Sequence, residues 1–333
     1  MFERIIVTLD GSASSEAALP AAEELARLLG SSLVLLHVLE ARAPRSVHGE
    51  RHLAGAAEAE AYLAPIVARL KAEGLEARAH VHEASGDGEQ GARSVSGSRG
   101  VAASVSAHQA EFGNDLAVMA AHGRRGLAEA LSGSLPLKVA AAGGAAVLLV
   151  PRVKGEAFGG ARGAAGRGGG PRRASGGEAA EPFVPTRVLV PLDGRSEHEV
   201  VLPAALAIAR AFGLGLRLLA VVPRSAAEAG GPGIAFARIA PALSGASLEY
   251  AAEGEEGYLA ELAARLAGEG LAIDWKVLRG KPAAKIVEAA QEGELIALST
   301  HRKLGLDASL DGCVAFGVAR AWGGAMLIAP VPR

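Results

Sequence analysis

Two segments of this chain, about half its length apart, carry the same pattern of apolar residues, aspartate and glycine. "RIIVTLDGS" at 4–12 returns as "RVLVPLDGR" at 187–195, so that Asp10 and Asp193 correspond at an offset of 183. Further along, "AVLLVP" at 146–151 returns as "AMLIAP" at 325–330, at an offset of 179. A long internal repeat sets the architecture, and 333 residues suit two domains. The chain is therefore predicted to be two copies of one unit.

Short apolar runs alternate with helical periodicity in each unit. In the first unit the predicted strands cover 4–9, 32–39, 75–82, 115–120 and 145–150, and the predicted helices cover 15–29, 53–73, 101–112 and 134–142. The strands are largely apolar rather than alternating, as expected where helices cover both faces of a parallel sheet. We therefore expect an α/β fold with two tandem, doubly wound, parallel five-stranded sheets and helices on both faces, of Rossmann-like type.

Glycine-rich segments mark the expected boundaries. We expect domains at 1–152 and 186–333, joined by a linker at 153–185. Ten glycines in that linker favour a flexible tether, with an anion-binding tail as the alternative for its arginines. Residues 85–100 are also rich in Gly and Ser and are predicted to form a mobile loop.

Composition excludes several classes of protein. A net charge of −2 gives no basic field for nucleic acid or an anionic membrane, and no uncharged run of eighteen apolar residues predicts a membrane span. The single cysteine, Cys313, excludes an intrachain disulfide and fits the cytoplasm. We expect Cys313 to be a small buried residue, the alternative being a thiol activated at a helix start. The histidines show no metal-ligand spacing and no catalytic motif is found, so no metal site and no catalytic residues are expected.

The stretch "AAHGRRGLAEALSGS" at 120–134 combines glycines, basic residues and a predicted helix start. Gly123 would let the backbone approach a ligand, and Gly133-Ser134 precede a helix whose free N–H groups favour an anion. Asp10 follows the first predicted strand and belongs to the same sheet edge. Taken singly, Ser134 is better explained as a helix cap and Asp10 as a turn residue. Together they predict a site for a phosphorylated ligand.

The pattern Ala120-x-x-Gly123, nine residues, Gly133-Ser134 resembles the nucleotide loop of the universal stress proteins, whose usual form is G-x-x-G, nine residues, G-[S/T]. "VTLDGS" and "LLHV" in the first unit also resemble that family. The resemblance covers both units outside the linker and the loop at 85–100. Ala120 departs from the usual glycine but is small enough to leave the ligand's path open.

This resemblance implies an ATP-binding stress-response module, with Mg²⁺ accompanying the ATP, that is non-catalytic or a very slow ATPase. An aspartate and a valine would frame adenine and ribose, and the loop would hold ribose and phosphates. The implied site residues are Thr8, Asp10, Val38, Met119, Ala120, His122, Gly123, Arg124, Gly133, Ser134 and Leu135. Two alternatives stay open: a stress protein that binds no nucleotide and acts through protein contacts, and a slow nucleotide-hydrolysing enzyme. Neither nucleic acid nor membrane is an expected partner, and the protein partner is unidentified.

The second unit departs further from the family pattern. Arg302 replaces the first loop glycine and Cys313 replaces the hydroxyl residue, so we expect a crowded site and one ATP per chain. The alternative is that Arg302 contacts phosphate directly. Since the fifth strands pair in dimers of the family, the strands at 145–150 and 325–330 are expected to pair within this chain as an intramolecular pseudo-dimer. That arrangement is also compatible with a homodimer of the whole chain.

Overall fold

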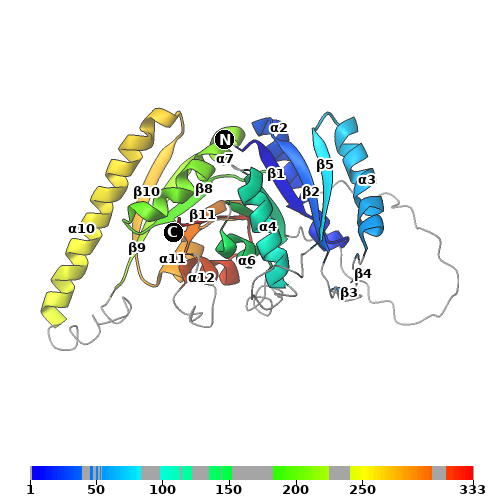
Figure 1. Ribbon diagram of the computed structural model, residues 1–333. Helices are drawn as coiled ribbons and strands as arrows, with labels where there is room; N and C mark the ends of the chain where they lie inside the picture. Colours follow the sequence, from blue (N-terminus) through cyan, green and yellow to red (C-terminus); the bar gives the residue numbers. More distant parts are fainter. Residues whose placement is uncertain are drawn as a thin grey trace.

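A computed structural model of the chain describes residues 2–39, 46–47, 50–51, 53, 55–83, 98–112, 115–121, 135–143, 145–151, 183–224, 241–301 and 313–332. Both repeats are α/β units, and their strands join in one ten-stranded sheet of order β5-β2-β1-β6-β7-β12-β11-β8-β9-β10 (Figure 1). None of the helices in these ranges is long and apolar enough to cross a membrane.

Each unit contributes five parallel strands, as the apolar runs predicted. The first unit supplies β1 (Arg4–Thr8), β2 (Ser32–Leu39), β5 (Ala77–Glu83), β6 (Asp115–Ala121) and β7 (Val147–Pro151). The second supplies β8 (Val188–Leu192), β9 (Leu216–Val222), β10 (Ile273–Arg279), β11 (Leu295–Thr300) and β12 (Met326–Pro330). A small hairpin of β3 (Ser46–Val47) and β4 (Glu50–Arg51), which the sequence did not predict, lies apart from this sheet.

The two halves meet where β7 pairs with β12 in antiparallel register. Leu148 lies opposite Leu327, and both side chains are fully buried. The predicted pairing of the two fifth strands is therefore confirmed. Because the pairing leaves neither strand as an exposed apolar edge, it removes a surface that would otherwise invite aggregation.

Helices cover both faces of the sheet, as predicted. In the first unit these are α1 (Ala13–Glu16), α2 (Leu19–Leu29), α3 (Ala56–Ala72), α4 (Ser98–Phe112) and α6 (Leu135–Ala142). In the second they are the 3-10 helix η1 (Ser196–Val201), α7 (Leu202–Phe212), α10 (Pro241–Leu266), the 3-10 helix η2 (Ala267–Glu269), α11 (Pro282–Ala289) and α12 (Val314–Ala321). Helices α2, α3, α7 and α10 bury one core, and α4, α6, α11 and α12 bury the other. Both cores run through the two units without interruption.

The predicted helix at 15–29 is two helices, and Pro20 explains the break. Proline has no N–H to donate to the carbonyl of Glu16, so it interrupts a continuous helix but fits the first turn of α2. Helix α2 ends as predicted at Gly30, whose φ of +67° suits glycine. The segment 85–100 also needs correction, because its last three residues form the first turn of α4. The rest of that segment, and the linker up to residue 182, lie outside the described residues.

Candidate functional site

The expected ligand edge lies at the carboxyl ends of β1, β2 and β6. Strand β1 has β2 on one side and β6 on the other, because the chain runs from β1 outward to β2 and β5 and then returns to β6 on the opposite side. This reversal of strand order is where open parallel sheets bind ligands. Thr8 is paired with Leu36 at the end of β1, and Val7 is paired with Val118 of β6. The predicted residues in these strands therefore gather at one switch point.

Most of the predicted side chains in the described residues share one face of the sheet. Val38 and Met119 belong to the core under α4 and α6, and Leu135 packs against that core from the first turn of α6. Thr8 falls on the same face by alternation from Ile6. Ala120 instead packs against the opposite core, so only its backbone can face a ligand on the α6 side.

Asp10 organises the turn that follows β1. Its Oδ1 accepts hydrogen bonds from the backbone N of Ser12 at 2.9 Å and from the Ser12 hydroxyl at 2.6 Å. The Ser12 hydroxyl in turn accepts from the backbone N of Ser15 at 3.1 Å and caps α1. Gly11 within this turn has φ +89°, and a β-carbon there would lie 2.7 Å from Leu53 Cγ. Asp10 therefore has the role of a turn residue that the sequence suggested, and these hydrogen bonds hold its carboxylate in place.

The remaining predicted residues belong to the segment 122–134, which connects β6 to α6 in the chain. They are His122, Gly123, Arg124, Gly133 and Ser134, and all five lie outside the described residues. Their part in the site remains a prediction.

A tyrosine–glutamate contact beside this turn was not found from the sequence. The Tyr62 hydroxyl of α3 donates to Glu16 Oε1 at 2.8 Å, and in the second unit the Tyr258 hydroxyl of α10 donates to Glu199 Oε1 at 3.0 Å. Burial raises the pKa of both tyrosines well above the usual value, and the adjacent glutamates raise it further. The contact braces the first crossover in both units. The repeat offset relates Glu16 to Glu199, but it does not reveal the tyrosine partners.

The corresponding edge of the second unit holds a cluster of acidic and imidazole side chains. His198 Nδ1 donates to Asp193 Oδ1 at 2.5 Å, and His198 Nε2 lies 2.9 Å from His301 Nε2. Glu197 Oε1 lies 3.7 Å from His198 Nε2 and 4.0 Å from His301 Nε2. By the repeat offsets, His198 corresponds to Ser15 and His301 to His122. Side chains larger than serine therefore stand around the second aspartate.

Cys313 is exposed, so the expected burial is wrong. It is the N-cap residue of α12, and its Sγ lies 4.0 Å from the Thr300 hydroxyl at the end of β11. A residue that begins a helix at a sheet edge stays outside the core even when its side chain is small and apolar. Arg302 and Gly312, the other second-unit loop residues singled out from the sequence, lie outside the described residues.

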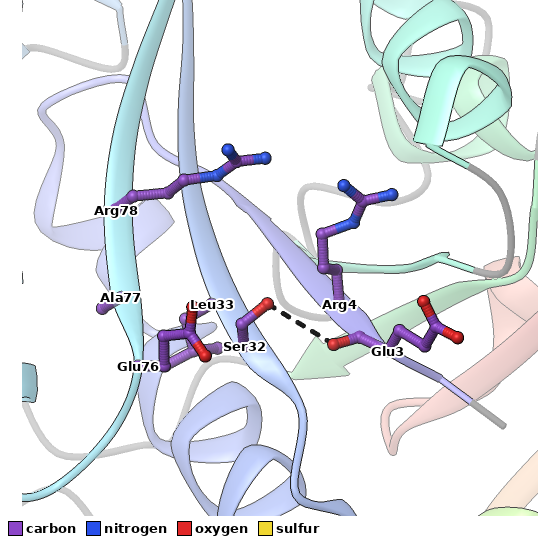
Figure 2. Close-up of a pocket in the computed structure, with 7 residues that line it drawn as sticks. All are labelled: Glu3, Arg4, Ser32, Leu33, Glu76, Ala77 and Arg78. Atoms are coloured by element: carbon purple, nitrogen blue, oxygen red, sulfur yellow. Dashed lines mark hydrogen bonds between the residues drawn. The ribbon is translucent and has the colours of Figure 1, made fainter.

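A surface hollow of about 400 Å³ lies at the opposite edge of the sheet, where β1, β2 and β5 begin (Figure 2). Arg4 and Arg78 reach into it from β1 and β5, and Ser32 donates to the Glu3 carbonyl at 3.4 Å. Because ligands of parallel sheets bind at the carboxyl ends of strands, this hollow is not our candidate site.

Comparison with known proteins agrees with this architecture. A family model described as the universal stress protein family matches residues 1–151 and 185–327. A search of curated proteins finds no match. A universal stress protein from Archaeoglobus fulgidus DSM 4304 is 14% identical with a TM-score of 0.58, and the alignment covers 98% of this chain and 96% of that one. A putative universal stress protein from Pseudomonas aeruginosa UCBPP-PA14 is 16% identical with a TM-score of 0.55, covering 99% and 93%. These likenesses show a shared fold over both units.

Proposed function

Because this chain belongs to the universal stress protein family, we propose that its first unit binds ATP at the carboxyl ends of β1, β2 and β6. The observation that carries the proposal is the loop pattern from Ala120 to Ser134, which connects β6 to α6 at the reversal of strand order. Thr8, Val38 and Leu135 line the same side of the sheet. An apolar platform beside a glycine-rich loop suits a nucleotide, which has a flat base and a charged phosphate chain.

Different residues are proposed to contact the nucleoside and the phosphates of ATP. Asp10 and Val38 would frame the adenine and ribose, and the Asp10 carboxylate would accept a hydrogen bond from a ribose hydroxyl. Gly133 and Ser134 would present backbone N–H groups to phosphate at the start of α6, where the helix dipole favours an anion. Arg124 and His122 would add positive charge, and Mg²⁺ would accompany the phosphates.

The site is proposed to bind rather than to hydrolyse. Asp10 and Glu129 are the candidate general bases; Glu129 lies outside the described residues, and Asp10 Oδ1 already accepts two hydrogen bonds from Ser12. A carboxylate engaged in this way is a poor general base, because the bonds stabilise its charged form. Nucleotide occupancy would then act as a signal, changing the shape or the partners of a two-unit module in a stress response. The boundaries 1–152 and 186–333 are our proposal for the two units.

One ATP per chain is the expected stoichiometry. In the second unit His198 and His301 stand beside Asp193, where the first unit has Ser15 beside Asp10. Because His301 corresponds to His122, the difference between the units is His198 in place of Ser15, and an imidazole ring leaves less room for ribose than a serine side chain does. Arg302 in the following loop adds a further bulky side chain at a glycine position.

Calorimetric titration of the full chain with MgATP tests the proposal. The variant Gly133→Val should lose about ten- to a hundredfold in affinity, corresponding to about 1.5–3 kcal/mol for one charge-assisted contact. The matched control is Gly312→Val at the equivalent position of the second unit, which should bind as the wild type does. The proposal fails if the wild type binds no ATP or if Gly133→Val leaves the affinity unchanged. A stoichiometry of two, half of which survives Gly133→Val, would contradict the asymmetry alone.

A further inference from the structure

The acidic and imidazole cluster of the second unit has the composition of a metal site. His198 comes from η1, directly after β8, and His301 follows β11, so 103 residues of chain separate two rings that touch. Glu197 completes a group whose ligand atoms all lie within 4.8 Å of one another. Two imidazoles and one carboxylate are a donor set that Zn²⁺ and related ions bind in proteins.

The distances within the cluster suit a tetrahedral ion. Tetrahedral metal–ligand bonds of about 2.0–2.2 Å place neighbouring ligand atoms roughly 3.3–3.6 Å apart. The nitrogens of His198 and His301 are closer than this, at 2.9 Å, and Glu197 Oε1 is slightly farther from each, at 3.7 and 4.0 Å. Small rotations of the Glu197 and His301 side chains, which are about half exposed, would bring all three atoms to that spacing, and a fourth coordination position remains for water or another ligand.

The tautomer of His198 is already the one that a metal requires. A carboxylate accepts hydrogen bonds, so His198 Nδ1 carries the proton that it donates to Asp193 Oδ1. In neutral His198 the lone pair is therefore on Nε2, which faces His301 and Glu197. This carboxylate–histidine arrangement orients metal ligands in many zinc sites. His301 binds a metal through Nε2 in the tautomer that carries its proton on Nδ1.

The surroundings carry surplus negative charge. Glu255 of α10 lies against Gly194, and burial together with the negative charge of Asp193 raises the pKa of its carboxyl. Its Oε2 is buried and accepts no hydrogen bond from the residues that the structure describes. Among the residues that the structure describes, Arg195 is the cation beside these carboxylates: it lies 3.7 Å from Asp193 and 3.8 Å from Glu197, with 65% of its side chain exposed. Within the described residues, the Asp193 and Glu197 carboxylates together carry more charge than this one exposed guanidinium offsets, which favours a divalent cation.

We propose that this edge of the second unit is a binding site for a divalent transition metal of the Zn²⁺ class. His198 Nε2, His301 Nε2 and the Glu197 carboxylate are the ligands, and Asp193 is a positioning residue that fixes the His198 tautomer. The second copy would then have exchanged a nucleotide for a metal at the same sheet edge. The site depends on residues of the second unit alone, so it does not rest on nucleotide binding in the first.

Zinc titration of the chelator-stripped full chain, followed by calorimetry, tests the site, and Co²⁺ absorption reports its geometry. We expect the wild type to bind, and His301→Gln and Glu197→Gln each to lose one equivalent of Zn²⁺ together with the absorption bands of tetrahedral Co²⁺. Asp193→Asn should weaken binding by about 10–100-fold, as changes to such orienting carboxylates do. His301 and Glu197 are about half exposed, and thermal unfolding of each variant checks that the fold is kept.

A matched control is needed because a second histidine group exists. His80 and His82 share a face of β5, and each ring packs edge-on against His108 of α4 with centroids 4.7 and 4.5 Å away. The His80→Gln variant should therefore still bind the equivalent of Zn²⁺ that His301→Gln no longer binds. Absence of Zn²⁺ binding by the wild type, or binding that His301→Gln and Glu197→Gln leave intact, would overturn the proposal. Gly133→Val should bind Zn²⁺ normally, which separates this outcome from any failure of ATP binding.

Discussion

The pairing of β7 with β12 predicts a measurable coupling between the two units. Leu148 and Leu327 are directly opposite, fully buried, and part of the same core. Truncating either to alanine removes three carbons, worth about 0.8 kcal/mol each in transfer free energy, and leaves a cavity. Each single variant should therefore lower the free energy of unfolding by about 2.7–5 kcal/mol.

A double-mutant cycle then isolates the contact across the seam. Because each truncation also removes the partner's contact, Leu148→Ala/Leu327→Ala should be less destabilised than the sum of the single variants, by about 0.5–3 kcal/mol. The control combines Leu327→Ala with Leu36→Ala in β2, which is also buried but is separated from β12 by three intervening strands. That pair should be additive within about 0.5 kcal/mol.

Urea unfolding followed by circular dichroism is the assay. The wild type should unfold in one cooperative transition, because both cores continue through the two units and α2 contacts α7 beside the seam. Two separate wild-type transitions, or full additivity of Leu148→Ala and Leu327→Ala, would refute the reasoning. Either result would mean that the units fold independently and merely touch.

Three further outcomes are expected. The Tyr62 pKa is raised above its ordinary value of 10.0 in the folded state. The contribution of Tyr62 to the free energy of unfolding is therefore complete below pH 10 and is lost as pH rises above it. Tyr62→Phe should lower the free energy of unfolding by about 1 kcal/mol at pH 7, and in urea unfolding it should reduce the loss of stability at alkaline pH. The Glu255 pKa is likewise raised above its ordinary value of 4.5, so the metal-free protein loses stability as pH rises from 4.5 through the pKa of the folded state. Glu255→Gln should stabilise the protein at pH 7 but not at pH 4. An equal effect at the two pH values would contradict the burial argument. By calorimetry, Asp10→Ala should weaken the binding of ATP and of AMP equally, whereas Arg124→Ala should weaken the binding of ATP more than that of AMP. Retained AMP binding in Asp10→Ala would contradict the assignment of Asp10 to the nucleoside.

The positions of strands and helices could be predicted because they depend on neighbouring residues. Apolar runs identified all five strands of the first unit, and Gly30 ended α2 where its positive φ allows. The repeat offset relates the two units residue by residue. The break before α2 was missed because helical periodicity continues through Pro20, although the missing N–H of proline signals it.

The sequence alone thus determined the two-unit organisation, the fold class and the family, since each is encoded in local periodicity or in a repeated motif. Only the tertiary structure decided that two rings 103 residues apart meet at 2.9 Å beside Asp193, and that tyrosines brace both crossovers. The order of strands in the sheet makes β8 and β11 neighbours, so the residues that follow them meet at one edge. No spacing along the chain carries that information, because strand order is fixed by packing between distant segments.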